Sequence, residues 1–239
     1  MPLPKIATPT YELELPSTRK PIHYRPFLVK EEKLLVLALE SEDTKEITTA
    51  IKNVIKSCIK TRGIKVETLP TFDIEYLFLN IRGKSVGEDI EVNLICPDDG
   101  KTQVPVTINI DDVKIQRTEG HTNKIKLDPT LMMEMKYPSL SEFIKNNFDF
   151  KEENVMDQSF ELIATCIDKI YNEEEVWAAG DCTKKEITTF LESMNSSQFK
   201  EIEKFFETMP KLSHKVKITN PNTNVESEVV MEGLSSFFG

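Results

Sequence analysis

The strongest constraint on the fold is a change of hydrophobic period within the first forty residues. Apolar and charged residues alternate from Tyr11 to Leu15, which is the period of a half-buried β-strand. The alternation resumes at Ile22 and Tyr24 after a polar turn, and it stops at Pro26. A helical pattern follows at once. The sequence therefore predicts a β-hairpin that leads directly into a helix.

Helical spacing of apolar residues recurs in the first half of the chain. It predicts a first helix over residues 28–41 and a second helix that begins at Asp43, where Asp43 and Glu46 have capping-box spacing. The segment 71–82 is apolar on nearly every side, which is typical of a helix at the centre of a fold or an interface. Further helix starts are expected at Ser139, Glu152, Thr183 and Asn195.

The predicted helix from about residue 152 has an apolar stripe that ends with Ile167 and Ile170. Strict alternation elsewhere predicts two hairpins, at residues 90–110 and 216–231, and short strands near Ile115 and Ile125. Helices and antiparallel hairpins together indicate an α+β fold. We expect two helix-plus-hairpin units, residues 1–137 and 138–239, which either share one core or have two.

The two hairpins have related turns. One reads Cys96-Pro97-Asp98-Asp99-Gly100 and the other begins with Asn220-Pro221, so aligning the prolines also aligns Val92 with Val216. An internal duplication is one interpretation of this match. The alternative is coincidence, because turns rich in Pro, Asn, Asp and Gly are common in hairpins.

Charge and hydropathy exclude several classes of protein. The formal net charge of -10, from 40 acidic and 30 basic residues, opposes general binding to nucleic acid. The longest aliphatic run, Leu34 to Leu39, is too short to span a bilayer, and the first residues lack the apolar core of a signal peptide. We therefore expect no membrane association, and four cysteines that stay reduced.

No constellation for catalysis, metal binding or phosphate binding is recognisable. Cysteines and histidines lack the close pairing of zinc ligands, and the 8 glycines form no phosphate-binding loop. We expect no catalytic residue, no metal and no cofactor. One remote alternative is a Cys-dependent hydrolase that uses Cys182 with His121 or His214.

Three groups of residues are candidates for contact with partner proteins. Lys52, Lys56 and Lys60 recur at steps of four, which indicates either a solvated helix face or contact with an acidic partner. Aromatic residues near the ends of the chain either pack within this fold or anchor a neighbouring subunit. These are Tyr24, Pro26 and Phe27 at the first corner, and Phe237 and Phe238 at the end.

The order of several segments resembles a family of phage proteins, the baseplate hub and hub-assembly proteins of T-even-type contractile-tail phages. The resemblance rests on Tyr24-Arg25-Pro26-Phe27, on Leu69-Pro70-Thr71-Phe72-Asp73-Ile74-Glu75-Tyr76-Leu77-Phe78 with Ile81-Arg82, and on Glu232-Gly233-Leu234 with Phe237-Phe238. Relatives often carry Cys-Pro-x-Cys-Gly at the hairpin turn, a half-site for zinc. Here Asp99 replaces the second cysteine of that motif, and the second hairpin has Asn220 in place of a cysteine. The hairpins are therefore expected to bind no zinc and to serve only as structural elements.

The resemblance implies a non-enzymatic late protein that takes part in baseplate hub assembly through protein–protein contacts. It leaves open a structural hub subunit, an assembly factor, and a transient chaperone that is absent from the virion. The implied partners are other hub proteins and the tape-measure protein, with a homo-oligomer as a further option. The implied location is the host cytoplasm during assembly, and the tail baseplate if the protein stays in the virion.

Overall fold

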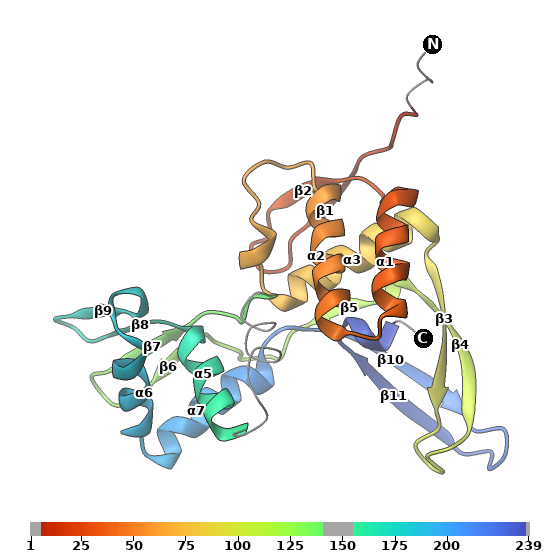
Figure 1. Ribbon diagram of the computed structural model, residues 1–239. Helices are drawn as coiled ribbons and strands as arrows, with labels where there is room; N and C mark the ends of the chain where they lie inside the picture. Colours follow the sequence, from red (N-terminus) through yellow and green to blue (C-terminus); the bar gives the residue numbers. More distant parts are fainter. Residues whose placement is uncertain (1–5, 141–154, 238–239) are drawn as a thin grey trace. The chain divides into compact units, whose positions relative to one another are not determined.

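The computed structural model describes residues 6–140 and 155–237, and the chain forms two compact units (Figure 1). The first unit comprises the described parts of residues 1–66, 72–116 and 211–239. The second comprises the described parts of residues 67–71 and 117–210. Helices and antiparallel sheets are both present, which confirms the predicted α+β class.

The first unit opens with the predicted hairpin. Strand β1 (Tyr11–Glu14) pairs with β2 (Pro21–Tyr24), so that Leu13 lies opposite Ile22. The chain then enters helix α1 (Val29–Glu40) through Leu28, whose backbone N–H donates to the Glu31 carboxylate at 2.8 Å. This hydrogen bond satisfies a backbone N–H group at the start of the helix and fixes the direction in which the helix begins.

Three helices lie together in the first unit (Figure 1). Helix α2 (Thr44–Cys58) begins where the sequence predicts, because the Asp43 carboxylate accepts from the backbone N–H groups of Lys45 and Glu46. Helix α3 (Thr71–Val86) is buried over most of its length, as its all-round apolar pattern indicates. At Gly83 a Cβ atom would approach Ile110 to 3.1 Å, so a side chain there would crowd the neighbouring 3-10 turn.

Two long hairpins complete the first unit. Strand β3 (Asp89–Ile95) pairs with β4 (Gln103–Asn109), and β10 (Lys211–Thr219) pairs with β11 (Glu226–Glu232). Strand β5 (Lys114–Gln116) adds to the other edge of β10. Apolar side chains from α3, both hairpins and the short helix η4 (Leu234–Phe237) form one core: Leu79, Ile90, Val92, Ile108, Ile110, Val113, Leu212, Met231 and Phe237.

The tips of the two hairpins are joined by polar contacts. The buried Asn220 amide donates to the carboxylates of Asp98 and Asp99, each at 3.0 Å, and the Thr223 hydroxyl donates to Asp98. Hydrogen bonds from Thr223 and Asn220 lower the pKa of Asp98, and those from Thr102 lower the pKa of Asp99. A side-chain network therefore holds together the two turns that the sequence aligns.

The second unit has a four-stranded antiparallel sheet in the order β6, β7, β8, β9, packed with helices. Its strands are β6 (Lys124–Lys126), β7 (Met132–Met135), β8 (Ile167–Tyr171) and β9 (Val176–Ala178), and its helices are α5 (Val155–Cys166), α6 (Lys184–Glu192) and α7 (Ser196–Thr208). Thr183 and Asn195 cap α6 and α7 as predicted. The predicted start at Ser139 runs into residues outside the described ranges.

Two sequence expectations differ from the structure. Ile167 and Ile170 do not continue a helix, because residue 167 begins strand β8, where Ile170 pairs with Met133. The division after residue 137 also differs from the observed units. Pairing of Leu212 with Ile115 places the C-terminal hairpin in the first unit, and local periodicity carries no information on such long-range pairing.

Candidate interaction surface

Helix α1 carries an apolar surface that its own unit leaves uncovered. Six consecutive aliphatic residues, 34–39, extend over more than one turn, so their side chains surround the helix. Leu34 and Leu37 are 52% and 53% exposed, and Val36 and Leu39 are exposed nearly as much. A contiguous aliphatic surface of this kind is typical of a site for protein–protein contact.

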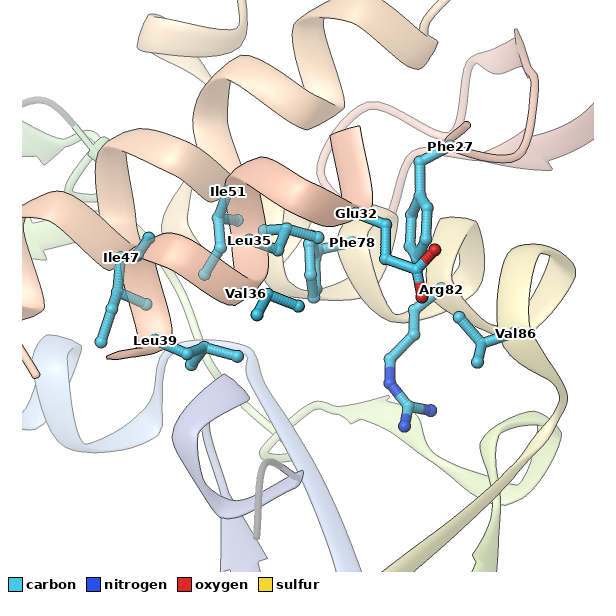
Figure 2. A pocket seen from close by; sticks show the side chains of 11 residues that line it. Phe27, Glu32, Leu35, Val36, Leu39, Ile47, Ile51, Phe78, Arg82 and Val86 are labelled. Atoms are coloured by element: carbon cyan, nitrogen blue, oxygen red, sulfur yellow. The ribbon is translucent and has the colours of Figure 1, made fainter. Parts of the chain in front are cut away.

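A cavity of about 200 Å³ opens between α1, α2 and α3 (Figure 2). Its walls are almost entirely apolar, with one carboxylate and one guanidinium among them. The lining residues are Phe27, Glu32, Leu35, Val36, Ala38, Leu39, Ile47, Ile51, Phe78, Arg82 and Val86. Val36, Leu39 and Val86 belong both to the cavity and to the exposed surface, so the hollow continues the apolar face of α1.

The other flank of α1 is hollowed as well. A wider groove of about 560 Å³ runs between α1 and α2, with Leu34 and Leu37 on one side and Thr49 and Ala50 on the other. Exposed aliphatic side chains therefore stand between two hollows. A partner that covered α1 could place side chains into both the cavity and the wider groove.

The corner before α1 is held by a buried ion pair. Nη2 of Arg25 lies 2.9 Å from Oε1 of Glu31, and these residues are 7% and 3% exposed. Burial favours a raised pKa for Glu31, but hydrogen bonds from Arg25 and Leu28 and the charge of Arg25 outweigh it and lower the pKa to about 2. Nη1 of Arg25 also donates to the carbonyl of Pro26 at 2.8 Å.

This corner is part of the fold's interior. Tyr24 and Pro26 are buried, which corresponds to the packing alternative for these two candidates. Phe27 is partly buried, lines the cavity of Figure 2, and donates its backbone N–H to the Ser85 hydroxyl at 2.9 Å. Of the three corner candidates, Phe27 is therefore the one that lies at the apolar surface.

The three lysines do not form one stripe on α2. Lys52 is partly buried and Lys56 is exposed, while Lys60 follows the end of the helix, and its backbone N–H donates to the carbonyl of His23 at 2.8 Å. At 100° per residue, Lys52 lies about 200° around α2 from Ala50, which faces α1 across the wider groove. The lysines and the apolar face are thus separate features.

At the C-terminus, Phe237 is 1% exposed and belongs to the core of the first unit. This burial corresponds to the alternative in which the terminal aromatic packs within its own fold. Phe238 lies outside the described residues.

The cysteines give no support to thiol catalysis. All four are free thiols; Cys58, Cys96 and Cys166 are buried, and Cys182 is partly exposed. In the second unit, Nδ1 of His121 lies 2.9 Å from the Thr208 hydroxyl and Nε2 lies 3.0 Å from the Tyr137 hydroxyl. Both ring nitrogens of His121 are thus engaged with partners other than Cys182.

Within 6–140 and 155–237, the His, Cys, Asp and Glu side chains form no group of three or more that could hold a metal ion. No helix in these ranges is both long and apolar enough to cross a bilayer.

Comparison with known families decides the identity. The family described as T4 bacteriophage base plate protein matches residues 8–239. The chain belongs to this family. It is a phage baseplate protein with a structural or assembly role, and other baseplate proteins are its partners. No curated protein and no solved structure matches the chain significantly.

Two parts of this surface are not predicted from the sequence. The run 34–39 predicts a helix and excludes a membrane span, yet six aliphatic residues in succession cannot all face one side of a helix. The run by itself therefore indicates that part of its apolar surface is exposed unless another segment or a partner packs on it. Arg82 lies within a family motif, but no local pattern of the sequence shows that it lines an apolar cavity.

Proposed function

We propose that this baseplate protein helps to build the baseplate hub, and that it does so by binding other hub proteins through the apolar face of α1. The observation that carries the proposal is the exposed run of aliphatic residues at 34–39 in a chain of the baseplate family. Burial of this surface against a partner removes apolar area from water and so favours association.

The proposal is non-enzymatic. It is supported by the engagement of both ring nitrogens of His121 with Thr208 and Tyr137. A Cys182→Ala variant tests it directly, because phage yield should equal that of the wild type. A large loss of yield with unchanged folding would contradict the non-enzymatic proposal.

Co-purification from infected cells tests the contact surface. A tagged chain should capture hub proteins, the tape-measure protein or both, and a double variant Leu34→Ser, Leu37→Ser should capture far less. Val176→Ser is a matched control, since Val176 is 65% exposed on the second unit. Equal capture by both variants would refute a role for α1, and no capture by the wild type would refute the hub proposal itself.

Two roles within the hub pathway are distinguished by the finished particle. A structural hub subunit should be present in stoichiometric amounts when purified virions are analysed by mass spectrometry. A transient chaperone of the hub and tape-measure proteins acts in the host cytoplasm and should be absent from virions. The exposed aliphatic face favours the structural subunit, because a lasting partner keeps that face out of water.

A further inference from the structure

Arg82, one of the residues that line the cavity of Figure 2, has a guanidinium nitrogen that is buried without a hydrogen-bond partner. Among the described side chains, Nη1 of Arg82 is the one buried nitrogen or oxygen in this state. Burial of a donor without a partner costs free energy, and desolvation of the partly buried guanidinium lowers the pKa of Arg82. Figure 2 shows the guanidinium turned away from the Glu32 carboxylate that lines the same cavity. A strong donor is thus left unused beside an apolar hollow.

The size of the hollow suits one large apolar side chain. Aliphatic walls come from Leu35 and Val36 of α1 and from Ile51 of α2, and Phe78 of α3 adds an aromatic ring. A dry cavity of about 150 Å³ lined by such groups is large enough to hold benzene. The cavity here, at about 200 Å³, therefore has room for a ring or a branched aliphatic group.

We propose that this cavity receives a segment of another baseplate protein in which a bulky apolar side chain lies next to a carboxylate. The apolar side chain fills the hollow, and the carboxylate pairs with the guanidinium of Arg82. Because the Arg82 side chain is only partly buried, rotation about its torsions brings the guanidinium to the incoming carboxylate. This inference rests on the proposed function and specifies the partner's chemistry.

Charge favours a different protein over a second copy of this chain. Each copy carries a net charge of -10, so two copies repel one another at long range. A carboxylate set within an apolar segment of a less acidic protein gains the Arg82 contact without that repulsion. Self-association through this face is therefore an outcome that would overturn the proposal.

Overlapping synthetic peptides that cover the other baseplate proteins of the same phage provide the probe. Binding of each peptide to the intact protein is measured by fluorescence anisotropy. We expect at least one peptide with adjacent apolar and acidic residues to bind. Changing its Asp to Asn or Glu to Gln should raise Kd at least about 10-fold with the wild type, and by less than about twofold with Arg82→Met.

Variants of the cavity separate recognition from folding. Arg82→Met removes a buried guanidinium nitrogen that has no partner, so its Tm should equal or exceed that of the wild type while it loses the carboxylate-dependent affinity. Val86→Glu places a carboxylate at the cavity and should also abolish peptide binding. Val225→Glu is the matched control, since Val225 is 45% exposed on the C-terminal hairpin and should leave binding unchanged.

Several results would overturn the inference. These are binding that is unaffected when the peptide carboxylate is removed, binding to Arg82→Met with the same affinity as to the wild type, a complete lack of peptide binding, or dimers in sedimentation that dissociate in Arg82→Met. If the tagged wild type still captures hub proteins in any of these cases, the proposed function stands and only the Arg82 inference fails.

Discussion

The buried ion pair at the hairpin-to-helix corner makes Glu31→Gln an informative test of what stabilises the first unit. The Glu31 carboxylate accepts from Nη2 of Arg25 at 2.9 Å, from the backbone N–H of Leu28 at 2.8 Å and from the Ser57 hydroxyl at 3.3 Å. Glutamine keeps the size of the side chain but removes its charge. Arg25 is then left as a buried cation without a counter-ion.

Two estimates give the same magnitude for this loss. The pKa of Glu31 falls from its ordinary value of 4.5 to about 2 in the folded protein. Since one pKa unit corresponds to about 1.4 kcal/mol, the carboxylate contributes about 3 kcal/mol to stability at neutral pH. Removal of one partner of a buried ion pair typically costs about 3–5 kcal/mol. We therefore expect Glu31→Gln to lower the free energy of unfolding by about 3 kcal/mol.

The lowered pKa of Glu31 also determines how the free energy of unfolding depends on pH. Because the pKa of Glu31 is lower in the folded than in the unfolded chain, its contribution is complete above pH 4.5 and is lost as the pH falls toward 2. Glu31→Gln has no such contribution to lose. The difference between the two proteins should narrow by about 1.4 kcal/mol between pH 7 and pH 3.5.

Urea unfolding followed by far-UV circular dichroism measures both quantities. Glu32→Gln is the matched control, because Glu32 is the next residue on α1, is exposed, and takes part in no ion pair among the described residues. Its free energy of unfolding should lie within about 0.5 kcal/mol of the wild type. Equal stability of Glu31→Gln and Glu32→Gln at pH 7, or a difference that does not change with pH, would refute the reasoning.

Three further predictions concern other parts of the fold. Asn220→Ala should lower Tm by about 4 °C, because its hydrogen bonds to the hairpin carboxylates are lost; an unchanged Tm in calorimetry would contradict this. Phe237→Ala should cost about 3–5 kcal/mol in urea unfolding, as a core aromatic does, and a cost below about 1 kcal/mol would show that the ring is dispensable. Burial and the charge of Arg117 lower the pKa of His121, so stability from its neutral ring is lost as the pH falls through that pKa; an NMR titration midpoint above 6.5 would be incompatible with this.

The sequence by itself determined the local elements. Asp43 and Thr183 mark helix starts because their side chains accept from backbone N–H groups one turn away, and that chemistry is contained in neighbouring residues. Alternation likewise predicted the hairpin of β3 and β4, and the all-round apolar pattern of residues 71–82 predicted a helix at the centre of its unit. The family motifs were also recognisable from the sequence, because they are defined by the order and spacing of residues along the chain.

Only the tertiary structure decided which elements pack together and which side chains stay exposed. Ile170 fits a helical stripe in sequence, but pairing with Met133 makes it part of a strand. The sequence left open whether Phe237 is a free end, and the structure places it in a core that includes residues more than a hundred positions away, such as Leu79 and Ile90. Leu34 and Leu37 support a helix in the sequence, and the structure leaves them about half exposed, while Arg82 lines an apolar cavity. These outcomes depend on contacts between distant segments, and periodicity within one segment does not encode them.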